Sequence, residues 1–210
     1  MTPMKRLVLA ALAATSLAAT LSACAPIILG GAAMTALVVT DRRTSGTQLE
    51  DEGIELRASN RIRDTVGGSM HINVNSYNRQ VLLTGEVTDT VARQTAEDVV
   101  ARVENVRSVV NEIAVVPLST LSQRSADTLI TGKVRASLVD ARDLSANAFR
   151  VVTERGTVYL MGRVTAREAD RATQIARNVS GVTRVIRIFE VISEDELVRI
   201  SNARAAQPAR

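Results

Sequence analysis

The chain has 210 residues, a formal net charge of +4 and only four aromatic side chains, none of them tryptophan. So few aromatics exclude a base-stacking platform for single-stranded nucleic acid, and so small a charge gives no reason to predict nucleic-acid binding. One cysteine and one histidine are too few to predict a disulfide framework or a typical multi-ligand zinc site.

Residues 1–23 have the layout of a secretory signal peptide. Lys5 and Arg6 precede an uncharged run from Leu7 to Leu21, and small residues then lead to Cys24. Leu21-Ser22-Ala23-Cys24 resembles the lipobox of bacterial lipoproteins. This resemblance implies that the Cys24 thiol receives a diacylglycerol, that cleavage occurs just before Cys24, and that the new amino group is acylated. Loss of residues 1–23 removes two basic residues and no acid, which leaves a formal charge of +2.

The main alternative for the N-terminus is an uncleaved membrane span. Pro26, Gly30 and Gly31 interrupt the apolar run, and residues 25–39 are shorter than the roughly 20 residues that a span needs. We therefore favour lipidation and interpret residues 24–48 as a lipidated N-terminus and tether. Its apolar part, residues 25–39, either lies on the membrane or packs on the folded body, and its polar part ends in water.

Residues 49–117 contain the first copy of a repeated pattern. Ile54, Ala58 and Ile62 recur at a helical spacing. Alternating residues around Ile72 then predict a strand, a turn follows over 76–79, and residues 81–87 predict a second strand. A second helix over 92–103 ends near Asn105, which tolerates the left-handed backbone conformation, and residues 109–116 predict a last strand.

Residues 125–193 contain the second copy, and residues 117–125, rich in Ser and Thr, are predicted to be the linker. Ile130, Val134 and Leu138 repeat the helical stripe, and the strands, the turn and the second helix follow in the same order. Gly85 and Gly162 occupy equivalent places inside strands, where glycine marks a bulge or a close backbone approach. Residues 194–210 begin with a helix-compatible stretch over 194–199, and we expect this C-terminal tail to be flexible and its end to fray.

The two copies resemble BON domains, the domain shared by bacterial osmotic-shock and nodulation-associated envelope proteins. The resemblance is carried by Val81-Leu82-Leu83-Thr84-Gly85-Glu86-Val87 with Val103-Glu104-Asn105-Val106, and by Val158-Tyr159-Leu160-Met161-Gly162-Arg163-Val164 with Val179-Ser180-Gly181-Val182. It implies an α+β fold of two tandem α-β-β-α-β units. Each unit would have a small three-stranded sheet covered by two helices.

Lipobox, tether and two BON units together resemble the dual BON-domain lipoproteins of the bacterial outer membrane. That resemblance implies a non-catalytic protein that binds anionic phospholipid, supports outer-membrane integrity and concentrates at division sites. Ala25 after the cysteine, rather than an Asp that retains lipoproteins at the inner membrane, implies outer-membrane sorting with the protein facing the periplasm.

Charge is distributed unequally between the copies. Residues 51–116 carry 7 basic and 10 acidic side chains, a net −3, whereas residues 127–192 carry 11 and 7, a net +4. Because anionic headgroups attract basic surface, the second copy is the better candidate for membrane contact. We expect Leu129 and Lys133 to lie on the exposed side of its first helix and to bind phospholipid, as the resemblance also implies.

Other residue patterns predict no chemistry. Arg163, Arg167 and Arg171 recur every four residues, which is typical of a solvated helix face. His71 lies in an alternating strand pattern, which predicts a polar side chain on one face of the strand rather than a catalytic base. The acidic residues show no metal-ligand spacing. We therefore expect no catalysis, cofactor or metal site. The alternative function is an adaptor that binds outer-membrane assembly or cell-wall proteins.

Overall fold

The computed structural model describes residues 41–67 and 70–205. The predicted signal peptide, the lipidation site Cys24 and the tether up to Thr40 lie outside the described residues, as do residues 206–210. No helix in the described part of the chain is both long enough and apolar enough to cross a membrane.

The first repeat follows the predicted order of elements. It comprises α3 (Ser45–Val66), β1 (Met70–Tyr77), β2 (Gln80–Val87), α4 (Thr90–Ala101), β3 (Ser108–Asn111) and β4 (Ala114–Val115). The predicted last strand is thus divided, and β3 and β4 both pair with β2. Asn105 has φ 66°, which confirms the left-handed conformation expected after the second helix.

The second repeat has the same order, and a last helix follows it. It comprises α5 (Leu121–Asp140), β5 (Phe149–Glu154), β6 (Thr157–Val164), α6 (Ala166–Arg177), β7 (Arg184–Val191) and then α7 (Glu194–Ala205). In both repeats the hairpin strands are antiparallel, and the last strand pairs in parallel with the middle one. The prediction of two α-β-β-α-β units in an α+β fold is confirmed.

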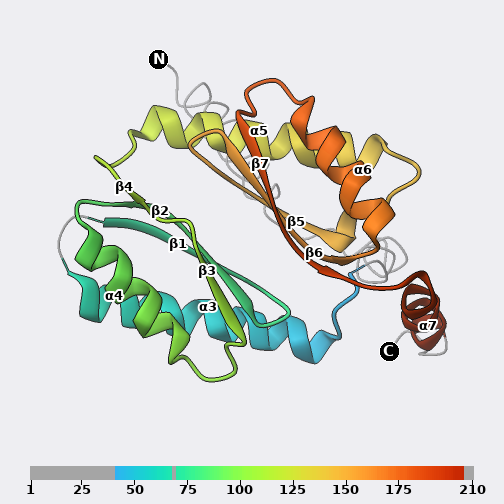
Figure 1. Ribbon diagram of the computed structural model, residues 1–210, viewed down its shortest axis with the longest axis horizontal. Coiled ribbons are helices and arrows are strands. Elements are labelled where there is room, and N and C mark those ends of the chain that lie inside the picture. The colour runs from blue at the N-terminus through green and yellow to red at the C-terminus, as the bar shows by residue number, and fades with distance from the viewer. Residues whose placement is uncertain (1–40, 68–69, 206–210) are drawn as a thin grey trace, which may run out of the picture. The chain divides into compact units, whose positions relative to one another are not determined.

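Each sheet packs one face against the two helices of its own repeat (Figure 1). In the first repeat, alternate residues of β2, such as Val81 and Leu83, meet the buried stripe of α3. In the second, Val158 and Leu160 of β6 do the same with α5. Strand side chains alternate between the two faces of a sheet. The other apolar residues of β2 and β6 therefore lie on the opposite face, which another part of the protein must cover.

The other repeat covers this second face of each sheet. Tyr77 and Leu82 of the first repeat form a buried cluster with Tyr159, Met161 and Ile188 of the second. Polar contacts extend this interface along β1 and β5. Arg150 Nη2 donates to Asn75 Oδ1 at 2.9 Å, and the Arg150 guanidinium pairs with Glu55 at 2.8 Å. The sheets therefore meet face to face, with helices on the outside.

The strand glycines permit close approach of a neighbouring backbone, as predicted. A β-carbon at Gly85 would lie 1.9 Å from the carbonyl oxygen of His71, and one at Gly162 would lie 2.4 Å from that of Ala148. Only glycine fits such a gap without moving the partner strand. The glycine of the repeated motif thus allows the hairpin of each repeat to close.

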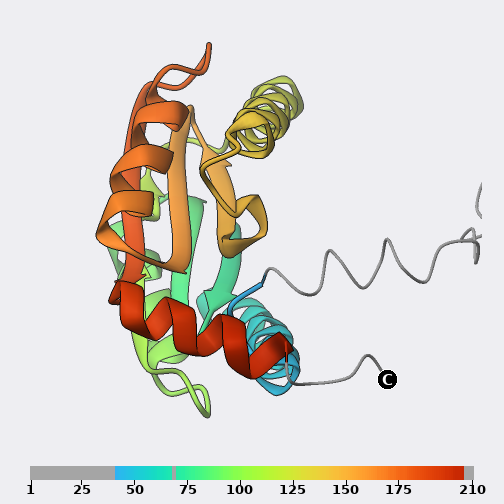
Figure 2. The same ribbon diagram turned by 90° about the vertical axis from the view of Figure 1, so that its right-hand side faces the viewer.

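Three predicted boundaries differ from the structure. Helix α3 begins at Ser45 with Thr44 as its N-cap, inside the predicted tether. Helix α5 begins at Leu121, inside the predicted linker, because Thr120 and Gln123 form a capping box. Residues 194–205, predicted to be flexible, form α7, whose first turn is capped by Ser193 (Figure 2). Within the Ser- and Thr-rich segment predicted to be the linker, Thr120 instead serves as an N-cap.

Candidate functional site

The outer face of α5 carries three exposed large apolar side chains. Leu121 is 81% exposed, and Leu129 and Val139 are each 67% exposed. Lys133 and Arg135 are exposed on the same helix. The structure therefore places Leu129 and Lys133 on the exposed side of the helix, one turn apart. From Leu121 onward the first acidic side chain on this outer face is Asp140, since Asp127 points inward and is buried.

Asp127 holds α5 in place through the hairpin of its own repeat. Its carboxylate accepts hydrogen bonds from the backbone N–H groups of Arg155, at 2.9 Å, and Gly156, at 2.8 Å, in the turn between β5 and β6. Asp51 binds the equivalent turn of the first repeat, at Asn78 and Arg79. Sequence reasoning missed both residues. The signal was available, because each aspartate lies three residues before the first isoleucine of its helical stripe.

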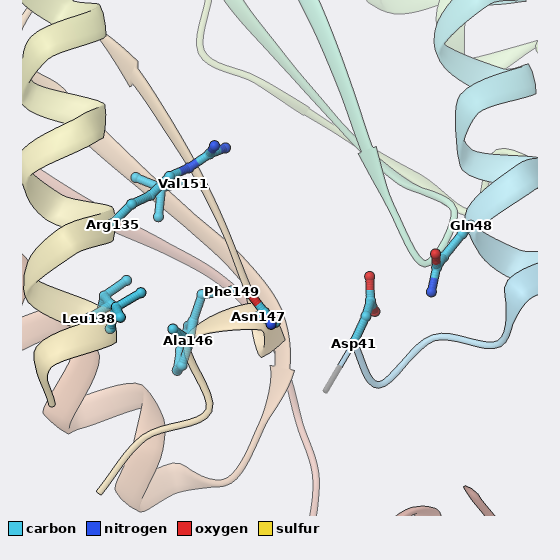
Figure 3. A pocket seen from close by; sticks show the side chains of 9 residues that line it. Asp41, Gln48, Arg135, Leu138, Ala146, Asn147, Phe149 and Val151 are labelled. Atoms are coloured by element: carbon cyan, nitrogen blue, oxygen red, sulfur yellow. The ribbon is translucent and has the colours of Figure 1, made fainter. Parts of the chain in front are cut away.

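A pocket of about 380 Å³ lies beside the C-terminal half of α5 (Figure 3). It is lined by Asp41, Gln48, Arg135, Leu138, Val139, Ala146, Asn147, Phe149 and Val151. Most of these side chains are apolar, and Arg135 supplies a cation at the wall. Sequence reasoning did not predict the pocket, because its lining brings residues 41 and 48, at the start of the first repeat, together with distant residues of α5, of the 146–148 turn and of β5.

Arg42 fixes the wall formed by the 41–44 segment. Its guanidinium makes two hydrogen bonds to the carboxylate of Glu168, both 2.7 Å long, and a third to the carbonyl oxygen of Arg163 at 2.8 Å. The side chains of Arg42 and Glu168 are only 7% and 4% exposed. Burial alone would raise the pKa of Glu168, but the hydrogen bonds from Arg42 and from the Thr165 N–H outweigh it and lower that pKa.

Arg43 attaches the same segment to the first repeat. Its guanidinium lies 4.2 Å from the ring centre of Tyr77 and pairs with Asp51 at 2.8 Å and with Asp41 at 2.7 Å. Arg42 thus contacts the second repeat and Arg43 the first. The expectation that the polar end of the tether lies free in water is wrong for residues 42 and 43, since both guanidiniums have partners inside the folded protein.

Of the predicted arginine stripe, Arg167 and Arg171 lie exposed on α6, as expected of a solvated helix face. Arg163 lies on β6 rather than on a helix and pairs with Glu190 at 3.0 Å and Glu196 at 2.8 Å. Arg171 pairs with Asp143 at 3.1 Å, and Arg167 donates to the carbonyl oxygen of Asp143. The structure does not bring these arginines together with Lys133 as one cationic surface.

Comparisons with known proteins agree with this architecture. The BON domain family matches the sequence twice, at residues 50–117 and 126–193. The outer membrane lipoprotein DolP of Haemophilus influenzae is 37% identical over 175 residues, which cover 82% of this chain and 90% of that protein. The 21 kDa hemolysin of Actinobacillus pleuropneumoniae is 35% identical over 154 residues, 72% of this chain and 79% of that protein.

Among solved structures, CdsD, a structural protein of the type III secretion system of Chlamydia trachomatis, aligns with a TM-score of 0.30 and 14% identity. The alignment covers 73% of this chain and 98% of that one.

Proposed function

Because this chain belongs to the BON-domain family, with two BON domains in tandem, we propose that it is a lipid-anchored, periplasm-facing protein of the bacterial outer membrane whose second BON domain binds anionic phospholipid. We propose further that it supports outer-membrane integrity at division sites and that it is not an enzyme. The sequence similarity to an outer membrane lipoprotein supports the location, and the lipobox-like residues before Cys24 support the anchor.

The observation that carries the phospholipid proposal is the outer face of α5. Exposed leucines next to a lysine can enter the interfacial region of a bilayer while the ammonium group meets phosphate. Each basic side chain near an anionic surface contributes about 1 kcal/mol. Leu129 and Lys133 are one helical turn apart and both exposed, so one helix can make both kinds of contact. The neighbouring pocket, with Arg135 at its wall, offers a place for part of a lipid.

The anchor allows this contact to be weak. One acyl chain gives only marginal membrane binding, and stable attachment needs a second signal or more chains. An acylated Cys24 would supply several chains. Headgroup binding by α5 then becomes an intramolecular event with a high effective concentration. Binding by the second BON domain would therefore depend on the charge of the membrane to which the protein is already attached.

Flotation with lipid vesicles tests the proposal without the anchor. The three core clusters of the described residues lie between Ile54 and Phe189. A soluble form beginning at Ala25 therefore keeps the fold. We expect it to float with vesicles that contain phosphatidylglycerol and not with phosphatidylcholine vesicles.

Two substitutions locate the contact. Leu129→Glu and Lys133→Glu should each reduce flotation, because both place an acidic group on the outer face of α5. Leu56→Glu is the matched control, since Leu56 is 64% exposed on α3, the equivalent helix of the first repeat. Absence of flotation with either vesicle would reject lipid binding in favour of the protein-binding adaptor. An equal loss in the Leu56 variant would reject α5 as the contact.

A further inference from the structure

Three side chains with metal-binding groups meet between the two BON domains. His71 on β1 and Glu86 on β2 are directly opposite each other in the antiparallel pair, so both side chains lie on the same face of the sheet. That face is turned toward the second repeat, where Glu154 ends β5. One nitrogen or oxygen atom from each of the three side chains lies within 4.8 Å of the others.

The two carboxylates are held away from water. Glu86 is fully buried and Glu154 is 5% exposed. Two buried carboxylates side by side repel each other unless a proton or a cation lies between them.

Glu86 also has an unsatisfied atom. Its Oε2 accepts a hydrogen bond from Ser119 at 3.1 Å, but its buried Oε1 has no hydrogen-bond partner in the described part of the chain. The nearest guanidinium atom, Nη1 of Arg155, is 3.8 Å from Oε1, beyond hydrogen-bond distance. Leaving a buried charged acceptor unpaired is costly, so this oxygen points to a missing electrophilic partner.

Neighbouring side chains orient the three groups as outer partners orient metal ligands. Asn73 Nδ2 donates to Glu154 Oε2 at 2.9 Å and lies 3.3 Å from His71 Nε2. Ser119, which holds Glu86, is itself held by Arg124 through a 3.1 Å hydrogen bond from Nε. Contacts from Asn73 on β1 and from Ser119, in the segment before α5, therefore orient the two carboxylates.

We propose that His71, Glu86 and Glu154 bind one divalent transition-metal ion of the zinc class, which joins the two BON domains. An imidazole nitrogen with two carboxylates suits such an ion better than calcium or magnesium, which prefer oxygen ligands alone. Zinc bonds to these atoms are about 2.0–2.2 Å long, so the three donors need to close to about 3–3.5 Å apart. Rotation of the glutamate side chains supplies the required change in separation, which is at most about 1.3–1.8 Å from the present 4.8 Å.

The rival explanation is that arginines neutralise the cluster. Arg155 lies near Glu86 as described, but its side chain is 44% exposed. Arg124 uses its Nε and Nη2 atoms on Ser119. Neither arginine donates a hydrogen bond to the unsatisfied oxygen. The two explanations differ in one measurable respect, since only the metal site involves the imidazole of His71.

The single histidine makes this test direct. Untagged protein beginning at Ala25 contains one imidazole, so its NMR signals belong to His71. Zinc chloride should shift these signals with a one-to-one stoichiometry, matched by isothermal titration calorimetry. Magnesium chloride should leave them unchanged. Zinc binding that leaves the imidazole signals in place would identify an adventitious ion only and overturn the proposal, as would the absence of binding.

Variants test the other ligands and the joining of the domains. Glu154→Gln should weaken zinc binding by about 100-fold or more, because even outer partners of metal ligands contribute 10–100-fold. Glu190→Gln is the control, since Glu190 also lies between the repeats, bound to Asn78 and Arg163, but far from the cluster. At a zinc concentration 100 times the dissociation constant, the unmodified protein and Glu190→Gln should melt about 5–10 °C higher than in EDTA. An equal rise in Glu154→Gln would overturn the assignment of that ligand.

Discussion

Glu168→Gln breaks the buried ion pair that fastens the 41–44 segment to the second BON domain. Glutamine has nearly the same shape as glutamate, and its amide oxygen can still accept the hydrogen bond that the Thr165 N–H makes to Glu168 at 3.0 Å. The N-cap of α6 is therefore kept. What is lost is the negative charge opposite Arg42, whose side chain is 7% exposed, together with the hydrogen bond from Arg42 Nη2, because an amide nitrogen cannot accept it.

The expected cost follows from this burial. Removal of one partner from a buried ion pair typically lowers the free energy of unfolding by about 3–5 kcal/mol, because the other charge stays buried and uncompensated. In a protein of this size such a loss lowers the melting temperature by about 6–20 °C. The double variant Arg42→Met with Glu168→Gln should be more stable than Glu168→Gln alone, since it leaves no lone charge.

Asp170→Asn is the matched control on the same helix. Asp170 pairs with Arg187 at the same distance of 2.7 Å, but these side chains are 68% and 52% exposed. Exposed pairs contribute about 0.2–1 kcal/mol. Urea unfolding of the soluble form, with circular dichroism as the signal, measures both variants. If Glu168→Gln costs no more than Asp170→Asn, the ion pair does not hold the 41–44 segment.

The lowered pKa of Glu168 adds a pH dependence with a definite sign. A carboxyl whose folded-state pKa lies below its usual value of 4.5 stabilises the protein fully above that value. This stabilisation is lost as the pH falls through the lowered folded-state pKa. The stability difference between the unmodified protein and Glu168→Gln should therefore shrink on acidification below about pH 4.5.

Gly85→Ala and Asp127→Ala test the hairpins, again by urea unfolding, with Gly132→Ala as a comparison. Gly85→Ala should destabilise by about 3 kcal/mol or more, because φ at Gly85 is 113° and the new β-carbon would overlap the carbonyl oxygen of His71. Gly132→Ala, in open space on α5, should instead stabilise by about 0.5–1 kcal/mol, and equal effects at the two glycines would contradict the close-approach argument. Asp127→Ala should cost about 1.5–3 kcal/mol, since two turn N–H groups lose a charged acceptor. A neutral result would mean that this turn closes without the aspartate.

Local patterns predicted the fold well because each pattern occurs in both copies of the repeat. The helical spacing of Ile54, Ala58 and Ile62 correctly identified the buried face of α3, and the same spacing in the second copy identified that of α5. The outer residues Leu129 and Lys133 followed from the same geometry. A helix with one buried stripe determines its exposed side, so their placement required no tertiary information.

The interface between the repeats could not be predicted in this way. Strand alternation separated Ile72 and Val74 from the polar residues between them, and a polar strand face is ordinarily solvated. Here that face meets the other repeat. His71 and Glu86 are 15 residues apart, and Glu154 is 68 residues further on. Their spacing along the chain therefore did not indicate that the three side chains form a cluster. Arg42 was equally hidden, since its partner Glu168 lies 126 residues away.

The shared apolar cluster has a consequence for the order of folding. Each repeat's own core joins residues within a segment of about 70, whereas Tyr77 and Ile188 of the shared cluster are 111 residues apart. Closure entropy rises with the length of the loop, and long-range contacts slow folding. We therefore expect the two sheets to join last, after each hairpin has formed on its helix. Until then Tyr77 and Leu82 stand open to the solvent, and the polar residues beside them on β1 keep the unfinished face from being a continuous apolar surface that invites aggregation.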